Sequence, residues 1–200
     1  MFTRRHLLAL PLALSMFKPA SALEPSAAKS HVEAAIDDIV QLMSSGGSTD
    51  VIAGGLAAVM ERRLSMPSVA RFVLGRSWRD LDADQKGRFT KAFTGSIARL
   101  YARRFAEFDV EEATLRQTIF LLGAEDAGRK GVLVKTEIRP PGLPIVRMDY
   151  LVSDRSGKTA IVDVVIEGVS TAITQRDIIA GMLEAEGGNV DALIATLDRL

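Results

Sequence analysis

The spacing of hydrophobic positions along this chain changes once, close to Glu111. Before that point, apolar side chains recur every three to four residues, which is typical of amphipathic helices. His31–Met43 has such a stripe, and weaker helical patterns cover Asp50–Leu64 and Ser68–Leu74. The adjacent glycines Gly54-Gly55 predict a bend or a close helix contact inside the second of these segments. The first half of the chain is therefore predicted to be helical.

The longest predicted helix runs from Asp82 to Phe108. Asp82 and Gln85 have the three-residue spacing of a capping box, in which each side chain accepts a hydrogen bond from the other's backbone. Large apolar side chains then recur on one face, at Phe89, Phe93, Ile97, Leu100, Tyr101, Phe105 and Phe108. We expect this stripe to cover the apolar face of a sheet.

From Glu111 onward the apolar positions alternate with polar ones, which is typical of strands. Turn-forming Gly, Pro and Asp residues separate the alternating segments, and such short connections favour antiparallel neighbours. The predicted strands are Thr114–Leu121, Val132–Arg139, Ile145–Ser153 and Thr159–Glu167. The pattern predicts an antiparallel meander.

The last strand leads into the sequence IVDVVIEGVS, residues Ile161–Ser170. Alternation places Val162, Val164 and Ile166 on the inner face of the sheet, and Ile161, Asp163, Val165 and Glu167 on the outer face. Gly168 suits a bend, and Ser170 or Thr171 can cap the helix that follows. Two closing helices are then predicted at Ile173–Glu186 and Asn189–Leu200.

Together these elements predict an α+β fold in a single domain, residues 23–200. It would consist of a helical part (29–108), a curved antiparallel sheet of about four to five strands (112–167) and closing helices (171–200). Leu23–Lys29 is interpreted as a mobile linker ahead of the first helix.

The first 22 residues are predicted to be a cleavable export signal. Arg4 and Arg5 form a basic start, Leu7–Phe17 is a short apolar core interrupted by Pro11, and Ala20-Ser21-Ala22 offers a cleavage site. The core is about half the length that a membrane span needs. The arginine pair followed by Leu7 and Leu8 approximates a twin-arginine signal, and the general secretion (Sec) route fits equally well. We therefore expect a periplasmic protein.

Charge and cysteine content exclude several classes of protein. The chain has 25 basic and 25 acidic side chains. Residues 1–22 contain three of the basic and none of the acidic ones, so the remainder has 22 against 25, a net charge of −3. A nucleic-acid-binding protein would need a strong basic excess. With no cysteine, the chain has neither a disulfide nor a cysteine metal site.

Three segments resemble a known family in the order in which that family has them. They are Arg71–Arg79 (RFVLGRSWR) with Gln85, Phe89 and Phe93 after it, then Leu143–Tyr150 (LPIVRMDY), and then Ile161–Ser170 with Arg176, Gly187-Gly188 and Asp191–Ile194. The chain is similar to the MlaC, or toluene-tolerance (Ttg2-type), family of periplasmic phospholipid-binding ABC-transporter auxiliary proteins. It differs at Thr159, where the family usually has Trp.

The resemblance implies a nuclear-transport-factor-like cone with added helices that enclose an apolar cavity. It also implies a monomeric shuttle that carries phospholipid between an inner-membrane MCE-type ABC transporter and an outer-membrane lipoprotein complex, which maintains outer-membrane lipid asymmetry. No cofactor is implied, since phospholipid is the cargo. A different reading is a non-catalytic interaction or scaffold subunit of the transporter.

Under this reading the aromatic stripe and the inner sheet positions line a lipid cavity. The alternative is that they form an ordinary packed core. The candidate lining residues are Val73, Leu74, Trp78, Phe89, Phe93, Ile97, Tyr101, Phe105, Val134, Val146, Met148, Tyr150, Val164, Ile166 and Val169.

Two groups of charged residues have alternative interpretations. Arg99, Arg103 and Arg104 lie in a helix segment without acids, which suits docking to anionic headgroups or an acidic partner, but equally a solvated helix face. Asp163 and Glu167 fit cross-strand pairing on an outer sheet face, although related cones hold isomerases and dehydratases with cavity carboxylates. The sequence has no histidine cluster, phosphate loop or nucleophile elbow. We expect no catalytic residues and no metal site.

Overall fold

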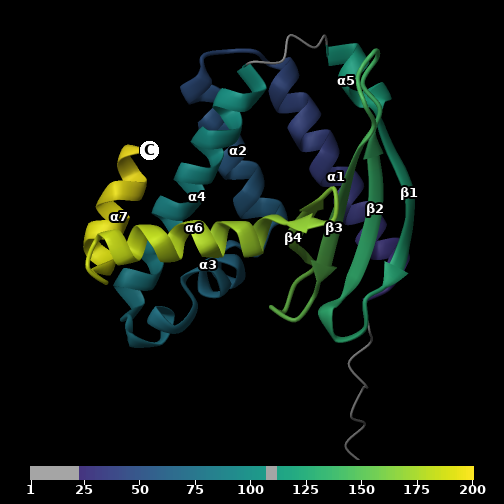
Figure 1. Cartoon of the computed structure of the whole chain (residues 1–200). Helices are drawn as coiled ribbons and strands as arrows, with labels where there is room; N and C mark the ends of the chain where they lie inside the picture. The colour runs from purple at the N-terminus through teal and green to yellow at the C-terminus, as the bar shows by residue number, and fades with distance from the viewer. Residues whose placement is uncertain (1–22, 107–111) are drawn as a thin grey trace, which may run out of the picture.

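The computed structural model describes residues 23–106 and 112–200. Its helices and a five-stranded sheet form the α+β architecture that the sequence predicts, with most helices to one side of the sheet (Figure 1). The predicted export signal and Phe108 lie outside the described residues. The elements are α1 Pro25–Ser44, α2 Thr49–Arg63, α3 Met66–Leu74, α4 Ala83–Ala106, α5 Glu112–Thr118, β1 Ile119–Asp126, β2 Val132–Ile138, β3 Val146–Ser153, β4 Ala160–Ile166, β5 Val169–Ser170, α6 Thr171–Ala185 and α7 Val190–Arg199, with 3₁₀ turns at Gly75–Asp80 and Gly128–Lys130.

The strands follow one another in sequence order, each antiparallel to the next. The predicted meander is therefore confirmed. Alternation along β2 buries Val132, Val134 and Thr136 as expected. Val134 is paired with Tyr150 of β3, which is paired with Val164 of β4, so these three side chains lie on the same face.

The prediction for the first strand is wrong in its boundaries. Thr114–Thr118 belongs to the short helix α5, and β1 continues past the predicted end at Leu121 to Asp126. The Arg116 guanidinium makes an ion pair of 2.9 Å with Asp37 of α1, which fixes this turn of helix against its neighbour. A register irregularity between Leu121 and Gly123 lets β1 pass the glycine and keep its pairing with β2.

Helix α1 covers the inner face of the sheet (Figure 1), which corrects two expectations. The segment predicted to be a mobile linker is the first turn of α1, where Pro25 occupies a position that does not need a backbone N–H. Ala28, Val32 and Ile36 are buried against the strands. The aromatic stripe of α4 was expected in that place, but it packs mainly on other helices.

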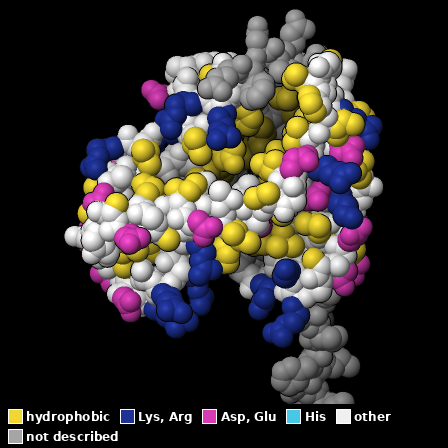
Figure 2. Space-filling view, viewed as in Figure 1, with side chains coloured by type: hydrophobic (Ala, Val, Ile, Leu, Met, Phe, Trp, Pro, Cys, Tyr) yellow, Lys and Arg dark blue, Asp and Glu magenta, His cyan; other side chains and the backbone are white. Residues whose placement is uncertain are grey.

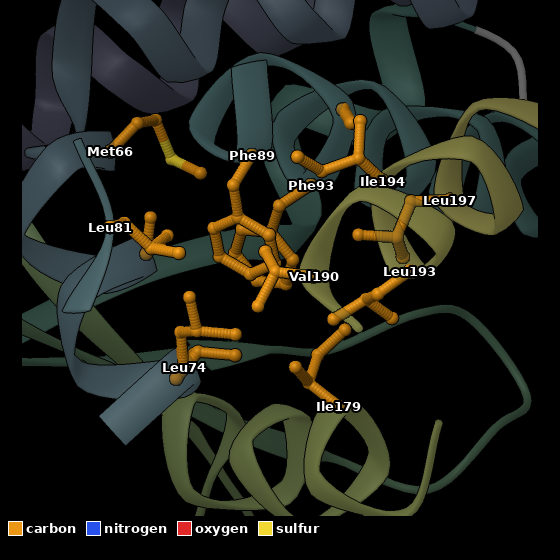
Figure 3. Close-up of a cluster of buried hydrophobic side chains, with 13 residues drawn as sticks. Met66, Leu74, Leu81, Phe89, Phe93, Ile179, Val190, Leu193, Ile194 and Leu197 are labelled. Carbon is orange, nitrogen blue, oxygen red and sulfur yellow. The ribbon is translucent and has the colours of Figure 1, made fainter. Parts of the chain in front are cut away.

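Helix α4 begins with the predicted capping box. The backbone N–H of Gln85 donates to Asp82 Oδ1 at 2.8 Å, and the N–H of Asp82 donates to Gln85 Oε1 at 3.3 Å. Further along, the Phe89 and Phe93 rings stack with their centroids 6.0 Å apart. Figure 3 shows these rings in the middle of a cluster to which α3, α6 and α7 also contribute. The helical part therefore has a core of its own.

The close helix contact predicted at Gly54-Gly55 is present between α1 and α2. A Cβ atom on Gly55 would lie 2.2 Å from Leu42 Cδ1, whereas a Cβ on Gly54 would meet no atom within 4 Å. An alanine at position 55 would therefore have to displace the Leu42 side chain, which the glycine avoids.

Candidate functional site

An apolar cavity lies where the sheet, α1 and the helical part meet. It has a volume of about 180 Å³, compared with the roughly 150 Å³ at which an apolar cavity already binds benzene. Figure 2 shows a hollow between the helices and the sheet with hydrophobic side chains inside it. The lining residues are Ala35, Ile36, Ile39, Leu56, Val59, Met60, Leu64, Met66, Val69, Phe93, Ile97, Tyr101, Phe105, Met148, Tyr150, Ile161, Val162, Asp163, Val164, Ile166, Thr171, Ala172 and Gln175.

Two facing walls of the cavity consist of residues that the sequence singled out. Four side chains spaced four residues apart on α4 form one wall, because that spacing keeps them on one helix face. Alternate residues of β3 and β4 form the other. These predicted residues in the lining are Phe93, Ile97, Tyr101 and Phe105 on α4, and Met148, Tyr150, Val164 and Ile166 on the sheet.

The remaining candidates lie outside this lining for different physical reasons. Some belong to the helical core: Val73, Leu74 and Phe89 are buried there, and Trp78 packs edge-on against Phe89. On the sheet, Val134 is fully buried in the cluster beneath α1, Val146 lies at the start of β3, and Val169 is 60% exposed just after the turn between β4 and β5.

Helices α1 and α2 supply lining residues that the sequence reasoning did not name. They include Ile36, Ile39, Leu56 and Met60. The sequence did mark two of them as inward-facing, because Ile36 and Ile39 belong to the helical stripe of His31–Met43. Periodicity shows which side of a helix faces inward, but it does not show whether that side meets another side chain or a cavity.

The polar groups in this lining are few. They are Asp163, Thr171 and Gln175 near the start of α6 and the hydroxyl groups of Tyr101 and Tyr150. Among residues 23–106 and 112–200, no lysine or arginine contributes to the lining. A wall of this composition suits hydrocarbon and disfavours an anionic group.

Asp163 borders the cavity, although alternation placed it on the outer face. Its carboxylate accepts hydrogen bonds from Ser170 Oγ at 2.5 Å, the Ala172 backbone N–H at 3.0 Å and Thr171 Oγ1 at 3.4 Å. Ser170 Oγ in turn accepts from the backbone N–H of Ile173, so the predicted cap is confirmed. Asp163 therefore holds the first turn of α6, where a negative charge is favourable.

Ile161 was also expected on the outer face and is instead buried in the cavity wall. The register shifts between Leu151 and Val152, which changes the face that the start of β4 presents. The Ile161 carbonyl also accepts a hydrogen bond of 2.9 Å from the backbone N–H of Ser65, which links the helical part directly to the sheet.

Glu167 lies in the turn between β4 and β5, with φ of 49° beside Gly168 at 81°. The bend predicted at Gly168 is therefore present. The Glu167 carboxylate accepts a hydrogen bond from the backbone N–H of Arg147, outside the cavity lining. Its role in the structure is to hold this turn against β3.

Two of the predicted docking arginines of α4 contact the carboxyl end of α7. Arg99 Nη2 donates to the Leu197 carbonyl at 2.8 Å, and Arg103 Nη1 donates to the Leu200 carbonyl at 2.7 Å. Both groups satisfy carbonyls at the carboxyl end of α7, where a positive charge is favourable. Arg104 is exposed. Docking of headgroups or partners by these arginines stays a prediction.

The described residues contain neither a group of metal-ligand side chains nor a helix suited to span a membrane. Across residues 23–106 and 112–200, no three His, Cys, Asp or Glu side chains lie together as metal ligands would. In the same residues, no helix combines the length and the hydropathy required to cross a membrane.

Comparison with known proteins decides the family. The sequence model of the MlaC protein family matches residues 29–199, nearly the whole described chain. The chain belongs to the MlaC family. A search of curated proteins found no match. Among solved structures, this MlaC-family chain is similar to the phospholipid-binding protein from Ralstonia solanacearum, solved in complex with a phospholipid. The identity is 20% and the TM-score 0.70, over 86% of this chain and 95% of the other, so the likeness shows a shared fold.

Proposed function

We propose that this protein is a periplasmic phospholipid carrier whose cavity holds the acyl chains. The observation that carries the proposal is the cavity between α4 and the sheet, whose lining is apolar apart from a few groups near α6 and two tyrosine hydroxyls. Membership of the MlaC family and the phospholipid complex of its structural neighbour support the same function.

The physical requirement for such a carrier is to hide hydrocarbon from water. Burial contributes about 0.8 kcal/mol for each CH₂ group, so a sixteen-carbon chain represents roughly 13 kcal/mol. The walls formed by Phe93, Ile97, Met148 and Val164 supply a suitable surface. Because no described lysine or arginine lines the cavity, the charged headgroup would stay in water and selectivity would depend mainly on the chains.

The proposed cellular role follows from the family. After removal of residues 1–22 by a signal peptidase, the monomeric carrier would exchange phospholipid with an MCE-type ABC transporter in the inner membrane and with a lipoprotein complex in the outer membrane. This exchange would maintain outer-membrane lipid asymmetry. The chain would contribute no covalent chemistry, since the cavity carboxylate of Asp163 already accepts hydrogen bonds from the start of α6.

Met148→Arg tests the proposal at the sheet wall of the cavity. An arginine there would place an unpaired charge among apolar side chains, which is strongly unfavourable for hydrocarbon in the same space. We expect the variant to retain less than a tenth of the phospholipid that the wild type retains. The measurement is extraction and phosphorus analysis of lipid that stays bound after incubation with phosphatidylglycerol vesicles and removal of the vesicles.

Leu122→Arg is the matched control, because Leu122 is 53% exposed on β1 of the same sheet and outside the cavity lining. It should retain lipid like the wild type. Circular dichroism would verify that both variants are folded. Full lipid retention by a folded Met148→Arg protein would contradict the proposed placement of the acyl chains.

A further inference from the structure

Tyr150 places a hydroxyl group in the cavity that has only a weak protein partner. Its side chain lines the cavity and is 9% exposed. The hydroxyl lies 3.2 Å from Met148 Sδ, and a thioether sulfur is a poor hydrogen-bond acceptor.

This arrangement is unusual for a buried tyrosine. A phenol in a protein interior normally finds an oxygen or nitrogen partner, since an unsatisfied buried donor is costly. A tyrosine hydroxyl keeps its proton at neutral pH and can donate, and burial raises the pKa of Tyr150 further, to about 12. The group therefore has a hydrogen bond available for a molecule in the cavity.

The surroundings indicate what kind of acceptor would fit. The described lining has no lysine or arginine and one carboxylate, Asp163, so a phosphate or a free carboxylate would be poorly accommodated. The acceptor that fits is therefore an uncharged group that lies next to hydrocarbon. The ester carbonyl that joins an acyl chain to glycerol has this chemistry.

We propose that the Tyr150 hydroxyl donates a hydrogen bond to an ester carbonyl oxygen of the bound lipid, and so makes the cavity selective for ester-linked over ether-linked chains. This inference rests on the proposed function and adds a specificity-determining residue to it. The ether analogue has no carbonyl oxygen projecting from the chain at this position, so it cannot accept the same hydrogen bond; its own oxygen lies within the chain.

The experiment is a competition between two lipids in the wild type and in Tyr150→Phe. Diacyl phosphatidylglycerol and its dialkyl ether analogue, with equal chain lengths, are offered together, and native mass spectrometry measures the ratio bound. A neutral hydrogen bond corresponds to about a fivefold preference, which the wild type should show for the ester. Tyr150→Phe should bind the two lipids about equally.

Tyr101→Phe is the comparison variant, because Tyr101 is the other tyrosine of the chain and lines the opposite wall. It should keep the ester preference. Loss of that preference in Tyr101→Phe and not in Tyr150→Phe would overturn the assignment. Equal binding of both lipids by the wild type would overturn the inference and leave the proposed function intact. Binding of neither lipid would overturn the proposed function itself.

A second measurement does not depend on how well a variant folds. The infrared band of a carbon-13-labelled ester carbonyl should lie at lower frequency in the wild-type complex than in a dry hydrocarbon solvent, because hydrogen bonding weakens the C=O bond. An ester band at the position found in dry hydrocarbon would contradict the hydrogen bond to Tyr150.

Discussion

Replacing Asp163 with alanine should destabilise the protein and release its lipid, because this carboxylate secures the start of α6. The substitution removes three acceptor contacts, to Ser170 Oγ, Thr171 Oγ1 and the Ala172 N–H. Hydrogen bonds to a charged group contribute about 1.5–3 kcal/mol each, and a helix cap about 1 kcal/mol. These bonds share one side chain and are not additive, so we expect a total loss of about 2–4 kcal/mol.

Thermal unfolding followed by circular dichroism measures this loss. For a protein of this size, each kcal/mol corresponds to a shift in Tm of about 2–4 °C, so Asp163→Ala should unfold roughly 5–15 °C below the wild type. Lipid retention should fall as well, since Thr171, Ala172 and Gln175 of the same helix line the cavity.

Asp177→Ala is the matched control. Asp177 lies on the same helix and is exposed, and its carboxylate makes no hydrogen bond or ion pair with another described residue. Its replacement should leave stability within about 0.5 kcal/mol of the wild type. If Asp163→Ala were equally mild, the capping role of Asp163 would be wrong, and a role in chemistry within the cavity would have to be reconsidered.

Two further predictions concern stability. Gly54→Ala should stabilise α2 by up to about 1 kcal/mol, because a Cβ at this position meets no neighbouring atom. Gly55→Ala should be less stable than Gly54→Ala by about 1–3 kcal/mol, because its Cβ meets the Leu42 side chain. Equal midpoints of urea unfolding for the two variants would contradict the tight helix contact. The raised pKa of Tyr150, about 12 against the model-compound value of 10.0, means that between pH 10 and 12 the unfolded chain loses this proton while the folded protein keeps it. Wild-type stability should therefore fall relative to Tyr150→Phe by about 2–3 kcal/mol at pH 12, and parallel pH profiles of the two proteins would exclude the buried phenol.

Local signals in the sequence predicted the elements that depend on local interactions. The capping box of Asp82 and Gln85, the cap at Ser170 and the alternation of Val132, Val134 and Thr136 each involve neighbours along the chain or one face of one strand. These features are present as predicted. The family resemblance added a prediction of the whole fold, and this prediction is also confirmed.

The sequence predictions were wrong where contacts between residues distant in the chain determine the local structure. Thr114–Thr118 is too short for its period to separate helix from strand, and its contact with α1 selects the helix. An irregularity in the register of β3 and β4 moved Ile161 into the cavity wall, which alternation alone cannot anticipate. Asp163 borders the cavity together with the start of α6, to which it is hydrogen-bonded. Periodicity also gave Phe89 and Phe93 the same face of α4, yet only Phe93 lines the cavity, whereas Phe89 packs against Trp78 in the helical core.

The most direct test of the central claim is native mass spectrometry of the mature protein, exported by the cell and purified without detergent. The account predicts a protein peak with the added mass of a phospholipid, and lipid extraction should identify its acyl chains. A protein that carries no lipid as purified and takes up none from phospholipid vesicles would contradict the claim that this cavity is a phospholipid site.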